Sequence, residues 1–152
     1  MYIVYHDQSG AHACVIAAAI HLDQLPIDQI PSKSEISRIP LFNKLEKHQI
    51  GRLIFHGTDK YGNSVYTIGR KRSSQLVTNA LQTVFDMIDG NKNQILCVDT
   101  SQENNRFISL GGMCSCRLGL TPLGDSLAAY GATRTYSRIA EIVKKTKLKI
   151  VP

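Results

Sequence analysis

The start of the chain joins a short β-rich run, a tight polar loop and a long run of small apolar residues. Residues 2–5 are typical of a strand, and residues 13–22 are apolar on nearly every face of a helix. A helix of this kind has to be buried, and a sheet that begins with the preceding strand can cover it. The N-terminal region therefore predicts a strand, a loop and a buried helix of an α/β domain.

The rest of the chain alternates between strand-like and helix-like segments. Two β-rich runs flank the turn sequence DKYGN, so residues 52–69 predict a hairpin. Apolar residues recur at helical spacing over residues 74–90, with Ser73 or Ser74 as the N-cap. We also predict short helices within residues 23–40 and 41–51, a central buried strand at 94–99, a helix at 104–120 with a close-packed Gly111–Gly112 seam, a last strand at 126–132, and a closing helix at 134–145 capped by Thr133.

This order of elements predicts the fold class: α/β, a three-layer domain with a mixed, mainly parallel sheet and one β-hairpin. The 152 residues show no repeat or linker, and we assign them to a single domain, residues 1–152. No apolar run approaches the roughly 18 residues of a membrane span. Because the N-terminus also lacks the features of a signal peptide, we expect a cytoplasmic protein that does not contact a membrane.

The net charge and the cysteines restrict the partners and cofactors. A net charge of +6 favours an anionic partner, and nucleic acid stays open as one, although the aromatic residues typical of RNA-binding strands are missing. Three of the four cysteines lie in apolar or small-residue runs, which predicts buried free thiols. The CSC sequence is one residue short of a C-x2-C zinc hook, so we predict no metal and leave the cofactor unknown.

The loop HDQSGAHA, residues 6–13, is the first candidate site. It lies between a strand and a helix, where backbone N–H groups and the helix dipole bind anions. Gly10 permits close approach of a ligand, His12 can act as a general acid or base, and His6 and Ser9 add polar groups. The alternative is that Ser9 or His12 only caps the helix. The position is P-loop-like, but a Walker A lysine and second glycine, G-x-G-x-x-G and C-x5-R are all absent from the sequence.

The basic sequence GRKRSS, residues 69–74, is the second candidate site. Arg70 and Arg72 precede a helix near the hydroxyl of Ser73, and this combination can hold a phosphate. The alternative is a solvated basic turn. Arg117 could reach the same crevice, although by itself it is typical of a surface residue.

The ends of the other strands decide which residues can meet the first loop. Asp99 ends a predicted parallel strand, so it is expected at the same edge of the sheet as His6. His56 ends the first arm of the hairpin and is expected at the opposite edge if the second arm is parallel to the first strand. A metal site from His6, His12, Cys14 and Asp99 is a weaker alternative, because their spacing does not place them on one face.

Three segments of the sequence are distinctive in combination: YHDQSGAHACVIAAAIHL with DQLP, GTDKYGNSVYTIGR, and SCRLGL with TPLG. In these segments the chain resembles a family of proteins of similar length from Firmicutes, catalogued as a domain of unknown function. The resemblance covers essentially the whole chain and implies no particular chemistry. It also implies a Gly-Gly pair and a hydroxyl residue in the first loop, where this chain has Ser9-Gly10 and Ala13-Cys14.

Together these features predict the binding of a phosphate-bearing small molecule, most plausibly a nucleotide, at the carboxyl edge of the sheet. In a hydrolase or transferase, His12 would be the acid or base and Asp99 would orient a ribose or a metal. The ligand would contact His6, Ser9, Gly10, Arg70, Arg72, Ser73 and Arg117. Two alternatives stay open: a nucleotide sensor or sequestering protein without turnover, and a basic interaction module that contacts nucleic acid. A homo-oligomer is compatible with each of them.

Overall fold

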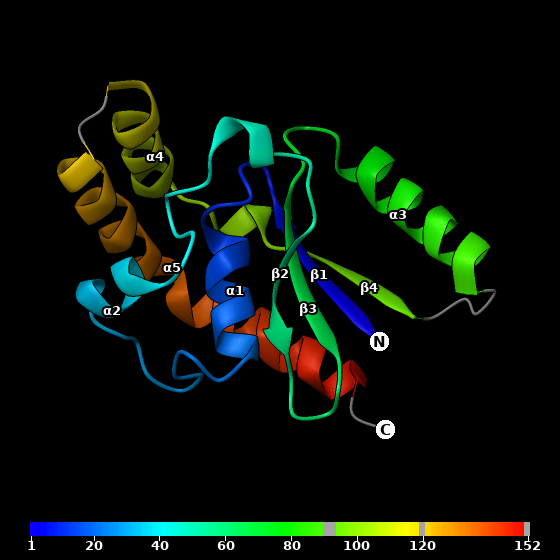
Figure 1. Ribbon diagram of the computed structural model, residues 1–152. Helices are drawn as coiled ribbons and strands as arrows, with labels where there is room; N and C mark the ends of the chain where they lie inside the picture. Colours follow the sequence, from blue (N-terminus) through cyan, green and yellow to red (C-terminus); the bar gives the residue numbers. More distant parts are fainter. Residues whose placement is uncertain (90–93, 119–120, 151–152) are drawn as a thin grey trace.

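The computed structural model describes residues 1–89, 94–118 and 121–150, apart from the side chains of residues 89 and 116–118. Its four-stranded sheet has the order β2-β3-β1-β4. β1 is parallel to β3 and to β4, whereas β2 is antiparallel to β3 (Figure 1). The strands are β1 (Tyr2–Asp7), β2 (Ile54–Thr58), β3 (Ser64–Gly69) and β4 (Ile95–Asp99). The predicted α/β class, with a mixed, mainly parallel sheet and one hairpin, is confirmed.

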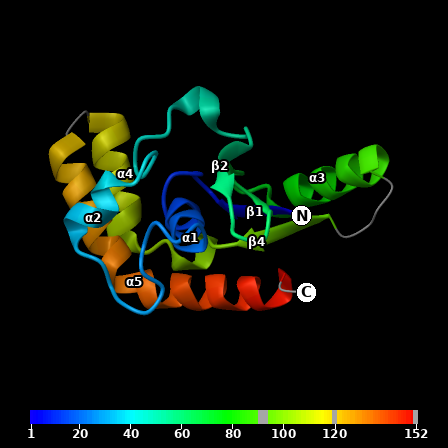
Figure 2. The ribbon, with the colours of Figure 1, turned by 60° about the horizontal axis from the view of Figure 1, so that its bottom comes forward.

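Helices lie on both sides of the sheet but cover its two faces unequally. Helix α1, buried along its whole length, lies between one face and α5 (Figure 2). On the other face α3 makes contact through Phe85, whose ring centroid lies 4.8 Å from that of Tyr2. No helix within the described ranges is long and apolar enough to cross a membrane. The helices are α1 (Ala13–His21), α2 (Lys33–Arg38), α3 (Ser74–Asp89), α4 (Arg106–Leu118) and α5 (Thr121–Ile150), with short 3-10 turns η1 (Lys47–Gln49) and η2 (Ser101–Glu103).

The predicted strand at residues 126–132 is wrong, because this segment is the N-terminal part of α5. The buried residues of α5 recur at helical spacing, so a helix buries them on one side. Small residues among them allow close packing with α4: a Cβ at Gly131 would lie 2.8 Å from the backbone nitrogen of Ile108. The short alanine-rich run is therefore a helix contact surface, and Thr133 lies within the helix rather than at its N-cap.

Two further predictions differ from the structure. β4 is an edge strand with β1 as its neighbour, not a central strand, and most of its residues are only partly buried. Residues 41–51 form turns and the single turn η1 instead of a short α-helix. The reason is that Leu41 and Asn43 have positive φ angles of 68° and 55°, which a right-handed helix does not accommodate.

The predicted glycine seam of residues 104–120 is confirmed at Gly111, and it generates a stability prediction. A Cβ at Gly111 would lie 2.6 Å from the backbone N of Ala128 and from the backbone O of Gly124. We expect Gly111→Ala to lower the free energy of unfolding by about 1–3 kcal/mol, because α4 and α5 have to separate. Urea denaturation measures this change. Ser109→Ala, at an exposed position of the same helix, is the control and should change stability by less than about 0.5 kcal/mol.

Candidate functional site

A cavity opens at the carboxyl edge of the sheet where the chain reverses its direction across the sheet. After β1 the chain forms β2 and β3, and β3 pairs with one side of β1. The chain then crosses to the other side of β1, where it forms β4. Open α/β sheets bind ligands at such a switch point, outside the carboxyl ends of the strands. The loops after β1 and β4 contribute to the walls of this cavity, whose volume is about 570 Å³. The cavity is large enough for a nucleotide-sized ligand.

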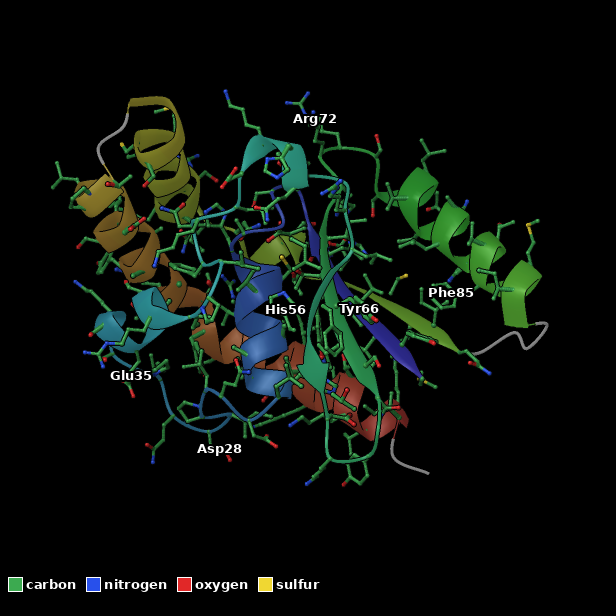
Figure 3. All side chains as sticks on the ribbon, viewed as in Figure 1. Asp28, Glu35, His56, Tyr66, Arg72 and Phe85 are labelled. Atoms are coloured by element: carbon green, nitrogen blue, oxygen red, sulfur yellow. The ribbon has the colours of Figure 1, made fainter. Side chains whose placement is uncertain are left out.

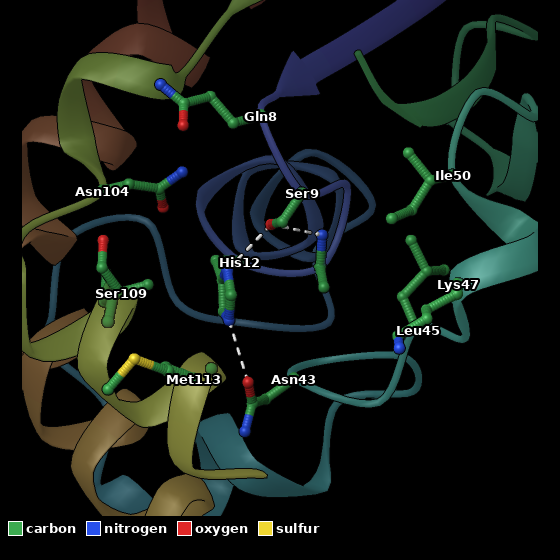
Figure 4. A pocket seen from close by; sticks show the side chains of 13 residues that line it. Gln8, Ser9, His12, Asn43, Leu45, Lys47, Ile50, Asn104, Ser109 and Met113 are labelled. Atoms are coloured by element: carbon green, nitrogen blue, oxygen red, sulfur yellow. Dashed lines mark hydrogen bonds between the residues drawn. The ribbon is translucent and has the colours of Figure 1, made fainter. Parts of the chain in front are cut away.

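The cavity has apolar groups on two walls, one formed by the turn around η1 and the other by α4, and several neutral polar groups (Figure 4). Leu45, Ile50, Ile108 and Met113 supply the apolar surface. Among the side chains that the structure describes, Lys47 is the one lysine or arginine in the lining, and no carboxylate belongs to it. The lining residues are Gln8, Ser9, Ala11, His12, Asn43, Leu45, Lys47, Ile50, Asn104, Ile108, Ser109, Gly112 and Met113.

The carboxylate of Asp7 organises the loop at the floor of the cavity. Asp7 is fully buried at the end of β1. Its Oδ1 accepts hydrogen bonds from the backbone N–H groups of Ser9, at 2.8 Å, and Gly10, at 2.6 Å. Its Oδ2 accepts from the N–H of Cys14 in the first turn of α1, at 3.3 Å. One buried side chain thus joins the strand, the loop and the helix.

The environment of Asp7 keeps it ionised. Burial alone would raise its pKa, but the charge of His12 and hydrogen bonds from Gly10, Asn104 and Cys14 outweigh burial, so the pKa lies below its ordinary value. Asn104 also accepts the N–H of Ala13, at 3.2 Å. Asp7 and Asn104 therefore cap α1, and the side chain of His12, at the N-cap position, does not. The first amides of α1 are engaged by the protein itself.

Gly10 is required by the conformation of the loop. Its φ of +80° is in the left-handed region, and an added Cβ would lie 2.6 Å from the backbone nitrogen of Gly69. At Gly69 a Cβ would overlap the backbone of Ser9. The close approach of these two glycines seats the β1–α1 loop on the end of β3. Gly10 therefore contacts the sheet, whereas the cavity is lined by its neighbours Ser9 and Ala11.

A chain of hydrogen bonds runs from the cavity into the protein through His12. The hydroxyl of Ser9 lies 2.8 Å from His12 Nδ1, and His12 Nε2 lies 2.9 Å from Asn43 Oδ1 (Figure 4). Asn43 Nδ2 donates to Asp125 Oδ1 at 2.6 Å and to the hydroxyl of Ser115 at 2.8 Å. These contacts connect the loop after β1 with the turn before η1 and with both α4 and α5.

This chain determines which nitrogen of His12 carries the proton. A carboxylate only accepts hydrogen bonds, so Asp125 fixes the amide of Asn43 with its nitrogen toward Asp125 and its oxygen toward His12. Neutral His12 then carries its proton on Nε2, and Nδ1 can accept the hydroxyl proton of Ser9. Gly112 leaves room beside the ring, since a Cβ there would lie 3.0 Å from His12 Cε1. The arrangement is a hydroxyl group paired with an oriented base at the floor of a cavity.

A second polar cluster lies at the same edge of the sheet but outside the cavity lining. Arg70, which is buried, donates from Nε to His6 Nδ1 at 2.8 Å and from Nη2 to Asp99 Oδ2 at 2.8 Å and Ser101 Oγ at 3.0 Å. Burial lowers the pKa of His6 against the opposing effect of Asp99, which fits an unprotonated Nδ1 that accepts from Arg70. Arg70 thus ties β3 to β1 and to β4.

The structure separates the predicted site residues into groups. Ser9 and His12 line the cavity, whereas His6, Arg70 and Asp99 form the second cluster. Arg72 and Ser73 are exposed, with Arg72 on the same side of the molecule as η1 (Figure 3). The side chain of Arg117 lies outside what the structure describes.

His56 and Cys14, which the sequence analysis also considered, can be placed in the structure as well. His56 lies within β2, level with Val65 and Tyr66 of β3, so it is displaced from His6 along the sheet but does not lie at the opposite edge that the parallel pairing predicted. Its Nε2 lies 2.8 Å from Thr67 Oγ1. Cys14 is buried, and burial raises the pKa of its thiol. No group of three potential metal ligands occurs among the described residues.

The sequence did not indicate Asn43 or Asp125. Asn43 lies in a segment that was predicted as a helix, and Asp125 lies 82 residues further along the chain. The one available signal was chemical: asparagine tolerates the positive φ that it adopts here. Neither residue belongs to a local motif, because their role depends on packing between distant segments.

The fold and the cavity thus define an α/β domain with a candidate ligand site at the switch point of its sheet. The chain belongs to the family described as Protein of unknown function (DUF3189), whose model matches residues 2–148. No curated protein and no solved structure matches the chain.

The contacts of Asp7 predict how stability depends on pH. Its pKa is lower in the folded protein than the ordinary value of 3.8. Its carboxylate therefore stabilises the fold above that value, and the contribution is lost as the pH falls through the folded pKa. We expect Asp7→Asn to lower the free energy of unfolding at pH 7 by about 3 kcal/mol, because it disrupts a buried network of donors. The variant should also show a weaker loss of stability below pH 4.

Urea denaturation of both proteins between pH 3 and pH 7 measures these effects. Asp28→Asn is the matched control, since Asp28 has an exposed carboxylate. Equal stability of Asp7→Asn and the unchanged protein at pH 7 would contradict the role given to Asp7.

Proposed function

We propose that the protein binds a phosphate-bearing small molecule, with a nucleotide as the first candidate, in the cavity at the carboxyl edge of the sheet. We further propose that Ser9 and His12 catalyse hydrolysis or group transfer on this ligand. The observation that carries the proposal is the hydrogen bond of 2.8 Å between the Ser9 hydroxyl and His12 Nδ1 at the cavity floor. A hydroxyl beside an oriented base is the arrangement of an activated nucleophile.

The lining of the cavity supports an anionic ligand with an apolar part. Among the described residues no carboxylate lines the cavity, the carboxylate of Asp7 is buried beneath the loop and neutralised by its donors, and Lys47 at the rim would supply a cation. Gln8 and Ser109 offer neutral hydrogen-bonding groups, and the space between the apolar walls suits a flat ring such as a base. The protein as a whole carries a net charge of +6, which also favours an anion.

In the proposed reaction the Ser9 oxygen attacks the phosphorus atom of the ligand. The hydroxyl proton passes to His12 Nδ1 as the new O–P bond forms and the bond to the leaving oxygen breaks. The protonated His12 returns this proton to the leaving oxygen. In the second step His12 deprotonates water or another hydroxyl, whose oxygen attacks the phosphorus atom while the bond between Ser9 and phosphorus breaks. His12 then returns the proton to the Ser9 oxygen. Attack by water gives hydrolysis, and attack by another hydroxyl gives group transfer.

Asn43 and Asp125 would act as positioning residues for this step. Asp125 fixes the amide of Asn43, and the amide oxygen of Asn43 accepts the Nε2 proton of His12 at 2.9 Å. The same oxygen can stabilise the positive charge that His12 gains during proton transfer. The second cluster of Arg70, His6 and Asp99 has no direct role in this proposal, because Arg70 is fully engaged by protein groups.

A specific observation favours one alternative, a binding protein without turnover. The Ser9 hydroxyl can instead donate its proton to Asp7 Oδ1, at 3.2 Å, and its oxygen accepts the N–H of Ala11 at 3.2 Å. These contacts give Ser9 a second role as a support of the loop. A sensor or sequestering protein would need this loop and the cavity, but not the transfer of a proton to His12.

Ligand binding is tested by thermal denaturation with mono-, di- and cyclic nucleotides. A nucleotide at 100 times its Kd should add about 2.7 kcal/mol of stability, which raises the Tm by several degrees. We expect Lys47→Ala to reduce this increase, because it removes the cation from the rim. Lys44→Ala, an exposed neighbour outside the lining, is the matched control. The absence of any shift, together with salt-dependent binding of RNA or DNA, would replace the proposal by the interaction module.

Catalysis is tested with a fluorophosphonate probe, which forms a stable bond with an activated serine hydroxyl, and with hydrolysis of the nucleotide that binds. We expect mass spectrometry to place the label on Ser9, and His12→Gln to slow labelling by about 100-fold or more, since the base is lost. Ser9→Ala should abolish both labelling and hydrolysis. Ser34→Ala, which removes an exposed hydroxyl on α2 outside the cavity lining, should leave both unchanged. Nucleotide binding without labelling or turnover would favour the sensor.

A further inference from the structure

Helix α3 presents an apolar face that no described part of the chain covers. The helix lies beside β4, away from the α1–α5 layer (Figures 1 and 2). Phe85 is directed toward the sheet, where it meets Tyr2 (Figure 3). Other large apolar side chains of the helix are exposed to a degree that is unusual for a monomer: Leu76 by 71%, Val84 by 50%, Met87 by 80% and Ile88 by 74%.

The exposed side chains form a stripe with the spacing of a helix–helix contact. Leu76, Ala80, Thr83 and Met87 follow one another at intervals of four, three and four residues along a helix of 16 residues. This spacing repeats at about 3.5 residues, the period at which two helices pack side by side. Val84 and Ile88 widen the stripe on one side. The stripe is thus suited to another helix.

The charges of α3 indicate which helix would fit. Although the protein has 18 lysines and arginines, α3 contains none of them. Its described acidic side chain, Asp86, lies near its C-terminal end, and the basic residues Lys71 and Arg72 lie just before its N-terminal end. The helix dipole adds positive charge at the N-terminal end and negative charge at the C-terminal end. Two copies of α3 in antiparallel orientation are therefore complementary in charge.

We infer that two copies of this chain form a two-fold symmetric dimer through antiparallel packing of their α3 helices. A two-fold axis midway between Ala80 and Thr83 brings Leu76 of each copy opposite Met87 of the other, and Ala80 opposite Thr83. The exposed stripe is therefore complementary to itself, as a symmetric dimer contact has to be. The absence of basic residues on the stripe disfavours nucleic acid as the occupant of this face.

The dimer leaves the proposed function untouched, because the cavity is lined by the loops after β1 and β4, the turn around η1, and α4, and by no described side chain of α3. The mass of the 152-residue chain in solution is measured by sedimentation equilibrium or by light scattering after gel filtration. We expect twice the chain mass of 16.8 kDa. A mass that stays at one chain over a wide range of concentration would overturn the inference.

Charged substitutions test the register of the contact. We expect Leu76→Glu and Met87→Lys each to raise the dimer Kd by about 100-fold or more, because each buries an unpaired charge. When the two variants are mixed, Glu at position 76 of one chain faces Lys at position 87 of the other, and the dimer should return. Gln82→Lys, on the exposed opposite side of α3, is the control and should remain dimeric.

Circular dichroism of each variant verifies that the fold is retained. A dimer that persists in both single variants would overturn the inference, since the contact would then lie elsewhere on the chain. Failure of the mixed variants to associate would overturn the antiparallel register.

Discussion

The ionised carboxylate of Asp7 is the interaction on which the site depends. It is removed from water at the end of β1, where a charge without partners would be very unfavourable. Donors from the loop, from the first turn of α1 and from Asn104 after β4 compensate for this loss of hydration. Three segments that are distant in the sequence are thereby held around one charge. The conformation of the loop that carries Ser9 and His12 follows from this arrangement.

The alternation of side chains along β1 separates the two polar clusters of the carboxyl edge. His6 and Asp7 are neighbours in the sequence, so their side chains leave the strand on opposite faces. His6 joins Arg70 and Asp99 in a cluster that links three strands. Asp7 faces α1 and supports the cavity loop. Arg70 is therefore used to hold the sheet together, and among the described side chains His12 and Lys47 are the basic ones that line the cavity.

The sequence allowed part of the site to be predicted, namely the part that a local pattern encodes. A polar loop between a strand and a buried helix indicated the position of Ser9 and His12, and both line the cavity. The sequence also predicted Arg70 beside these residues, but in the structure Arg70 binds His6 in the second cluster. The strand register and the partners of Arg70 are not local properties, so the sequence could not show this. Asn43 and Asp125 were missed for the same reason. They meet only because α4 and α5 pack closely at Gly111 and Gly124.

The sequence by itself determined the α/β class, the hairpin, the buried helix α1 and the amphipathic helix α3, because hydrophobic periodicity and turn residues act over short distances. Tertiary structure decided whether residues 126–132 form a strand or a helix, since a short run of alanines fits either state until α4 covers it. It also decided the place of β4 at the edge of the sheet. Above all, it selected the proton position on His12, through an amide and a carboxylate contributed from distant parts of the chain.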